Sequence, residues 1–147
     1  MKLPADRSDA ASMARIETTF PRETPATVGQ SQFVQPTRCG RNLIAEVVVP
    51  SIGQREAPII AMEVGSWIEE LPRGRGYFIL DMSAVTVISS IGLGMCLDLR
   101  HRAIEQGRQC VLYGLNRHLL DLFRMMKVDR MYKIVHGGAA LRKLLDK

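Results

Sequence analysis

The 147-residue sequence has little of what marks a secreted, membrane-spanning or metal-binding protein. Its three cysteines are an odd number without paired spacing, which argues against a disulfide framework and against a zinc site. No stretch approaches the roughly 18 uninterrupted apolar residues of a membrane-spanning helix. The N-terminal residues also lack the continuous apolar core of a secretory signal. We therefore expect a cytoplasmic protein without a membrane span, a metal site or a cofactor.

Aromatic residues are scarce as well, at 5% of the chain, and no run of like charge exceeds two residues. The net charge of +5 arises in the last third, where residues 98–147 hold eleven Lys and Arg against five Asp and Glu. Clustered cations favour nucleic-acid binding, but base stacking needs interleaved aromatic side chains, which are missing. We therefore interpret the excess as helix surface and expect no direct contact with nucleic acid.

With 46% apolar residues, the chain has enough apolar side chains for one globular domain. Residues 1–30 are an exception, because Ala, Ser, Thr, Pro, Glu and Arg dominate them and no apolar period is sustained. We expect 1–30 to be a disordered or flexible tail and 31–147 to be the compact domain.

The domain begins with a pattern typical of a hairpin. Two apolar segments, Gln32–Gln35 and the β-branched run Leu43–Val49, are separated by the turn residues of Cys39–Asn42. Pro58 is then expected to open a helix. Its buried face follows a 3.6-residue period and comprises Ile60, Val64, Trp67, Ile68 and Leu71.

Strands and helices alternate in the rest of the chain. Short apolar runs predict strands at Tyr77–Asp81, Gln109–Tyr113 and Lys133–Val135, the first of them buried on both faces. Helices are predicted at 92–106, at 117–126 and at 139–145. The buried stripe of the helix over 92–106 is predicted to be Leu93, Cys96, Leu97, Ala103 and Ile104, with Cys96 as a core residue rather than a reactive thiol. The fold class is therefore α/β: a mixed four- to five-stranded sheet with an initial hairpin, packed against about four α-helices.

The segment Val85–Gly94, between a buried strand and an amphipathic helix, carries the chemistry. Ser89 or Ser90 is well placed as the N-cap of that helix, and Gly92 and Gly94 allow a tight turn or the close approach of another chain. The same helix N-terminus favours a phosphate, so a serine here is also a candidate phosphoacceptor. The residues by themselves leave both interpretations open.

The chain from Tyr77 onward, and more weakly from residue 31, resembles a STAS domain of the bacterial anti-sigma factor antagonist type. In that family the loop typically reads Asp-Ser-Ser-Gly-Leu-Gly, and its first serine is phosphorylated by an anti-sigma factor that is a serine kinase. The resemblance places the phosphoacceptor on Ser90, with Ser89 as second choice. It places the partner-binding loop and helix on Ser89, Ile91, Gly92, Leu93 and Gly94.

The sequence departs from this pattern at several positions. Ser89 stands where the family usually has aspartate, and Ile91 stands where it has a second serine. Gly53-Gln54-Arg55-Glu56 resembles the family's Gly-x-x-Asp, with Glu56 in place of the aspartate. We expect Glu56 and Asp81, the last residue of the predicted strand before the loop, to support the site.

The resemblance implies a non-enzymatic regulator that binds a serine-kinase-type anti-sigma factor and is switched by phosphorylation of Ser90. The alternative is a STAS interaction or scaffold module, in a stress-signalling assembly or a lipid-transport complex, without phosphorylation control. A phosphatase as a further partner and a weak GTP or ATP site are left open. His101, His118 and His136 are not spaced as metal ligands or as part of a catalytic triad, so we expect no enzyme.

Overall fold

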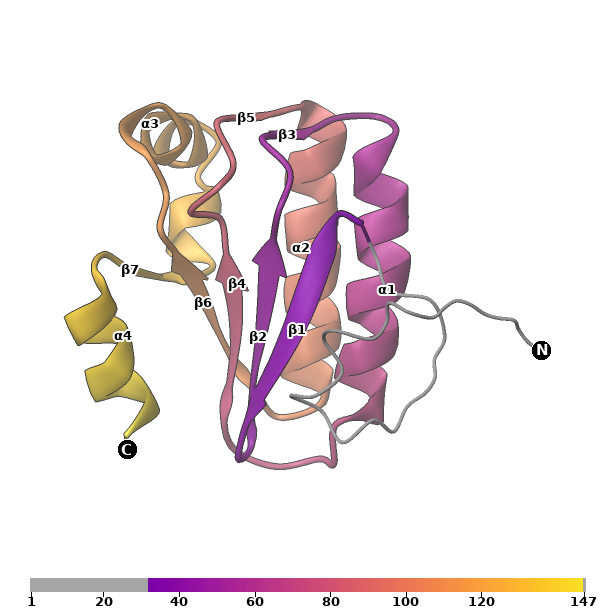
Figure 1. The fold of residues 1–147 in the computed structure, drawn as a ribbon, viewed down its shortest axis with the longest axis vertical. Coiled ribbons are helices and arrows are strands. Elements are labelled where there is room, and N and C mark those ends of the chain that lie inside the picture. Colours follow the sequence, from indigo (N-terminus) through magenta and orange to yellow (C-terminus); the bar gives the residue numbers. More distant parts are fainter. Residues whose placement is uncertain (1–31, 147) are drawn as a thin grey trace. The chain divides into compact units, whose positions relative to one another are not determined.

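The computed structural model describes residues 32–146 (Figure 1). The predicted flexible tail of residues 1–30 lies outside the described residues and stays a prediction.

The described residues form a five-stranded mixed sheet in the order β1-β2-β4-β6-β7. The β1–β2 hairpin is antiparallel and turns at Gly40 and Arg41, and every later pairing in this sheet is parallel. The strands are β1 Val34–Cys39, β2 Asn42–Val47, β4 Tyr77–Asp81, β6 Gln109–Tyr113 and β7 Lys133–Val135. The last three have the predicted bounds. The first strand begins and ends later than the predicted segment, and it includes Cys39 of the predicted turn.

Four α-helices connect and cover these strands, and with the hairpin they confirm the predicted α/β fold. They are α1 Glu56–Glu70, α2 Ser90–Glu105, α3 Arg117–Met125 and α4 Gly138–Leu145, and a 3-10 turn covers Val128–Arg130. Helices α1 and α2 pack side by side against one face of the sheet, and α4 packs at the other (Figure 1).

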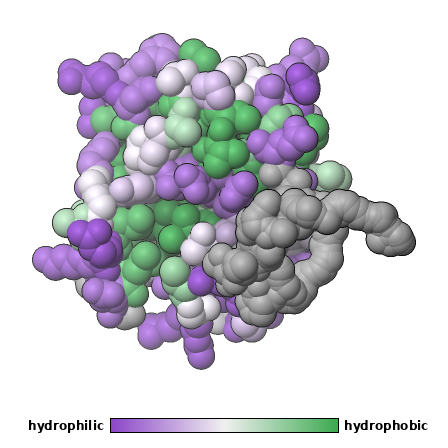
Figure 2. All heavy atoms as spheres, in the orientation of Figure 1, coloured by the Kyte–Doolittle hydropathy of each residue, from purple (hydrophilic) through white to green (hydrophobic). Residues whose placement is uncertain are grey.

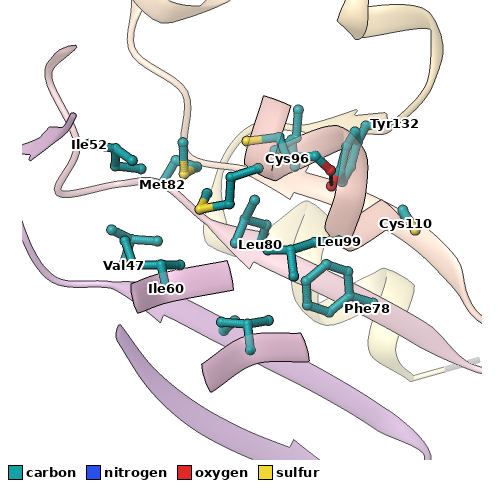
Figure 3. Packing of buried hydrophobic residues seen from close by; sticks show 14 of the residues in the cluster. Val47, Ile52, Ile60, Phe78, Leu80, Met82, Cys96, Leu99, Cys110 and Tyr132 are labelled. Atoms are coloured by element: carbon teal, nitrogen blue, oxygen red, sulfur yellow. Dashed lines mark hydrogen bonds between the residues drawn. The ribbon is translucent and has the colours of Figure 1, made fainter. Parts of the chain in front are cut away.

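The central strand β4 explains why its sequence is almost continuously apolar. Phe78 and Leu80 point to the side of α1 and α2, where they pack among Ile60 and Leu99 (Figure 3). Ile79 points to the opposite side and packs in a second cluster that includes α4. The prediction that this strand is buried on both faces is confirmed.

Two predictions about helix surfaces were wrong. Leu97 and Ile104 of α2 are 37% and 45% exposed, and the buried face of the helix contains Met95 and Leu99 instead. The helix packs against both the sheet and α1, so its buried stripe is centred on Leu99 and its neighbours one turn away rather than on the flank.

Helix α1 also begins earlier than predicted, at Glu56 rather than at Pro58. Proline is tolerated in this first turn because the first backbone N–H groups of a helix have no acceptor within it. The sequence likewise gave no indication of a second, two-stranded parallel sheet, formed by β3 Ser51–Ile52 and β5 Val87–Ile88.

Candidate functional site

The N-termini of α1, α2 and α3 lie at one end of the molecule, the upper end in Figure 1. Parallel strands connected by helices place the carboxyl ends of the strands, and hence the starts of the following helices, at the same edge of a sheet. Free backbone N–H groups and the positive ends of helix dipoles therefore gather here. The segment that the sequence singled out, Val85–Gly94, belongs to this end.

Ser89 has a structural role as the N-cap of α2. Its backbone is extended (φ −87°, ψ 173°), and its Oγ accepts a hydrogen bond from the Gly92 N–H at 3.1 Å. The Ser89 N–H donates to the Ile52 carbonyl at 2.9 Å, and the Ser89 carbonyl accepts from the Leu93 N–H. All its polar groups are thus engaged in holding the helix start.

Ser90 differs from its neighbour in its position and in its side chain. It is the first residue of α2, its side chain is exposed, and its Oγ has no hydrogen-bond partner among the described residues. A phosphate on this oxygen would lie beside the free N–H groups of the first helical turn, where negative charge is favoured.

The small β3–β5 sheet fixes the position of this loop. The Pro50 carbonyl accepts hydrogen bonds from the Thr86 N–H at 2.7 Å, the Val87 N–H at 3.2 Å and the Thr86 Oγ1 at 3.0 Å. The segment that precedes α1 is thereby joined to the segment that precedes α2. Residues far apart in the sequence form one surface at this end of the molecule.

The two predicted supporting residues each fold a loop. A Glu56 carboxylate oxygen accepts a hydrogen bond from the Gly53 N–H at 3.0 Å, which closes the β3–α1 turn. An Asp81 oxygen accepts from the Ser83 N–H at 2.9 Å and from its Oγ at 2.6 Å, which starts the β4–β5 loop. In the part of the chain that the structure describes, no hydrogen bond joins either carboxylate to Ser90.

The glycines of the loop have different surroundings. A Cβ on Gly92 would lie 2.5 Å from the Ile88 Cγ1 and 3.1 Å from the Ile52 carbonyl, so the β3–β5 sheet requires glycine there. A Cβ on Gly94 would meet nothing within 4 Å. Gly94 is therefore not needed for packing and leaves α2 open to the outside.

A largely apolar surface begins at Ile91, the residue that follows Ser90. Ile91 is 47% exposed, and between α1 and α2 there is a shallow hollow of about 200 Å³. Its lining consists of Ala57, Pro58, Ala61, Ile91, Gly94, Met95 and Asp98, which we call the α1–α2 hollow. Met62, the residue after Ala61 on α1, is also exposed.

Of the predicted partner-binding residues, Ile91 and Gly94 line this surface, whereas Gly92 and Leu93 are buried beneath it. The sequence did not indicate that α1 also lines this surface. Its small residues Ala57 and Ala61 look like ordinary members of an amphipathic helix. Exposed Met62 is the one signal that could have indicated a contact surface.

Two of the three cysteines lie in the core. Burial raises the pKa of the Cys96 thiol to about 12 and that of Cys110 to about 11, so both are neutral core residues. Within residues 32–146, no group of three or more His, Cys, Asp or Glu side chains is arranged to hold a metal ion. Among the same residues, no helix has the length and apolar character needed to cross a membrane.

The order of strands and helices, together with the loop that carries Ser89 and Ser90 at the start of α2, is typical of one class of protein. Residues 42–137 match the family model of the STAS domain, so the chain belongs to the STAS domain family. No curated protein matches the chain.

Solved structures share the fold at low sequence identity. An anti-sigma-factor antagonist (STAS) domain protein from Planctomyces limnophilus is 12% identical with a TM-score of 0.68, over 80% of this chain and 98% of that one. The anti-sigma factor antagonist SpoIIAA in its unphosphorylated form is 10% identical with a TM-score of 0.58, over 75% of this chain and 94% of that one. The murine anion transporter solute carrier 26 family member A9 is 16% identical with a TM-score of 0.55, over 76% of this chain and 19% of that one.

Proposed function

We propose that this chain is a non-enzymatic regulator of the anti-sigma factor antagonist type. It binds a serine-kinase-type anti-sigma factor through the apolar surface around Ile91 and the α1–α2 hollow, and phosphorylation of Ser90 releases that partner. One observation carries the proposal. Of the two adjacent serines, the Ser89 hydroxyl caps α2, whereas the Ser90 side chain is exposed and its hydroxyl makes no hydrogen bond with residues 32–146.

A phosphate on Ser90 acts on the surface rather than on the fold. It adds about −1.5 to −2 charges and three acceptor oxygens. The N-terminus of α2 tolerates this charge, so the domain stays folded. The neighbouring side chain of Ile91 is apolar and exposed, and a partner covering it would have to bury the phosphate as well. The desolvation cost of that charge weakens the complex.

The departure from the family pattern at Ser89 is compatible with this function. Serine and aspartate are both strong N-cap residues, and Ser89 caps α2 through its hydroxyl. The serine therefore preserves the helix start while removing one negative charge beside the acceptor. That change alters the electrostatic surroundings met by a kinase, and the acceptor hydroxyl itself stays free.

A related protein supports the proposed modification. SpoIIAA, which shares the fold, has been solved both unphosphorylated and in a phosphorylated form. A corresponding cycle for this chain needs a phosphatase that restores the free hydroxyl of Ser90.

Phosphosite mapping by mass spectrometry on protein recovered from its own cell tests the proposal. We expect a phosphate on Ser90, lost in a Ser90→Ala variant and retained in a Ser89→Ala variant. Incubation of the purified chain with its serine-kinase-type anti-sigma factor and ATP should give the same pattern. An unmodified Ser90, with a related antagonist labelled in parallel, would contradict the proposal, and a phosphate on Ser89 alone would contradict the choice of acceptor.

The similarity to a segment of an anion transporter favours a second candidate, an interaction module without phosphorylation control. Pull-down with Ser90→Ala and Ser90→Asp variants separates the two functions. Partner switching predicts that the aspartate variant loses the anti-sigma factor that the alanine variant retains. Identical partners for both variants would favour the scaffold function.

A further inference from the structure

Three loops meet at the end of the domain opposite to Ser90, the lower end in Figure 1, and a buried arginine joins them. The Arg108 Nε donates to the carbonyl of Arg41 at 3.0 Å. Its Nη1 donates to the carbonyls of Pro72, Gly74 and Gln106 at 2.7, 2.7 and 3.1 Å. The residue is only 2% exposed. Arg108 thus ties the β1–β2 turn, the α1–β4 loop and the α2–β6 loop into one surface, which we call the loop end.

The loop end carries several arginines that are not paired with a carboxylate in the part of the chain that the structure describes. Within residues 32–146, none of its arginines forms an ion pair, since the salt bridges of the described residues lie on the helices. The Nη2 of Arg108 is buried without a partner. Burial lowers the pKa of Arg108, and the charges of Arg38 and Arg41 lower it further. The arginines of the loop end are Arg38, Arg41, Arg73, Arg75 and Arg108.

Structural needs account for only part of this cluster. Helices α1 and α2 end here, and the carbonyls at helix C-termini favour cations, which explains Arg108. Arg73 and Arg75 are exposed and make no hydrogen bond or ion pair with the described residues. The loop that carries them approaches the β1–β2 turn closely, at a position that favours glycine. Gly76 has φ +144°, and a Cβ on it would lie 2.6 Å from the Arg41 carbonyl.

We propose that the loop end binds a short acidic segment of a partner protein, whose carboxylates pair with Arg41, Arg73 and Arg75. The guanidinium group presents a planar fork of donors that matches a carboxylate, which makes arginine the suitable cation. The lowest part of the described residues in Figure 2 is hydrophilic, so the partner is recognised by charge rather than by an apolar anchor.

Acidic residues beside the arginines favour a short segment over an extended polyanion. Glu70 ends α1 and Glu105 ends α2, both exposed next to the loops. A membrane of anionic lipids or a DNA duplex would bring negative charge over these carboxylates together with the arginines. A short acidic segment can contact the arginines and avoid the two glutamates.

The loop end and the Ser90 surface are separated by the length of the sheet. A five-residue strand such as β4 spans about 17 Å, so the two surfaces can be occupied together. The acidic segment therefore binds whether or not Ser90 is phosphorylated, and this inference does not depend on the proposed function.

Binding of the full chain to a fluorescein-labelled peptide of alternating glutamate and glycine, followed by fluorescence anisotropy, tests the proposal. We expect a double variant, Arg73→Glu with Arg75→Glu, to weaken binding by about tenfold or more. The control double variant, Arg124→Glu with Arg130→Glu, makes the same charge change on exposed residues outside the loop end. It should change the affinity by less than about twofold. Equal losses of affinity in the two double variants would show that the peptide is attracted by the overall charge, which would overturn the proposal. Undiminished binding by the Arg73→Glu, Arg75→Glu variant would also overturn it.

Further binding measurements identify the class of partner and separate this inference from the proposed function. A matched peptide with glutamine in place of glutamate should not bind. A DNA duplex and phosphatidylserine vesicles are tested in the same way. If either binds more tightly than the acidic peptide, and Arg73→Glu with Arg75→Glu abolishes that binding, the assignment to a protein segment is overturned. Ser90→Asp should leave peptide binding unchanged, and a loss there would contradict the independence of the two surfaces. Thermal unfolding of each variant checks that the domain is intact.

Discussion

Gly92 and Gly94 provide a matched pair of substitutions in one helix. Replacement of either glycine by alanine raises helix propensity by about 0.5–1 kcal/mol. At Gly94 nothing opposes this gain, because the added Cβ meets no atom within 4 Å. At Gly92 the Cβ would lie 2.5 Å from the Ile88 Cγ1 and 3.1 Å from the Ile52 Cγ2 and carbonyl oxygen.

The cost at Gly92 follows from these distances. Ordinary contacts between carbon atoms are about 3.5–4 Å, so Ile88 must move by roughly 1 Å. Ile52 is fully buried and cannot yield in the same way. Overpacking of this kind costs about 1–3 kcal/mol. The propensity gain is common to both variants, so the difference in free energy of unfolding between them isolates this steric cost at about 2 kcal/mol.

Urea denaturation followed by circular dichroism measures this difference directly. We expect Gly94→Ala to be more stable than the parent chain and Gly92→Ala to be less stable than Gly94→Ala by the stated amount. Equal stabilities of the two variants would refute the close approach of the β3–β5 sheet to α2. A destabilised Gly94→Ala would refute the open surface at that position. Because its Cβ enters the α1–α2 hollow, Gly94→Ala should also bind the partner more weakly despite its greater stability.

Three further predictions concern the serines, the core thiol and the buried arginine. Ser89→Ala should lower the free energy of unfolding by about 1 kcal/mol through loss of the cap, and Ser90→Ala should leave it unchanged. Urea denaturation measures both variants. Equal effects would contradict the distinct roles of the two serines. Burial raises the pKa of Cys96 from 9.0 to about 12, so between these pH values the folded chain keeps the thiol proton that the unfolded chain releases. The contribution of the neutral thiol to stability is therefore fully present below pH 9. The free energy of unfolding should fall by about 4 kcal/mol as the pH rises from 9 toward 12. Denaturation across that range should show a shallower decline for Cys96→Ala. Arg108→Met should lower the free energy of unfolding by about 3 kcal/mol, because four backbone carbonyls of the loops lose their hydrogen-bond donor. An unchanged midpoint of urea denaturation would show that these hydrogen bonds do not stabilise the loops.

Local features of the sequence were sufficient to predict most of the strands and helices, and the helix that begins at the two adjacent serines. The strands Tyr77–Asp81 and Gln109–Tyr113 are apolar runs that follow a glycine or the residue after one, and their predicted bounds agree with the structure. The adjacent serines at the start of α2 indicated both a helix cap and a candidate acceptor. These signals reside in a few neighbouring residues, since strand alternation, helix period and capping act over one or two turns of chain.

The roles of individual side chains depended on contacts between distant segments. The sequence could not show which serine caps α2, because Ser89 is held by a hydrogen bond to Ile52 on a strand too short to predict. It could not place Leu97 outside the core, since the packing of α2 against α1 and the sheet sets the buried face.

The sequence by itself thus determined the order of strands and helices and the location of the serine loop, because the pattern for each lies within the segment that forms it. The tertiary structure decided that Ser89 rather than Ser90 caps α2 and that α1 and α2 share a hollow. It also decided that Arg108 joins the loops that carry the other arginines. Exposure and charge compensation depend on which distant groups lie within a few ångströms of a side chain, and only the folded chain sets those distances.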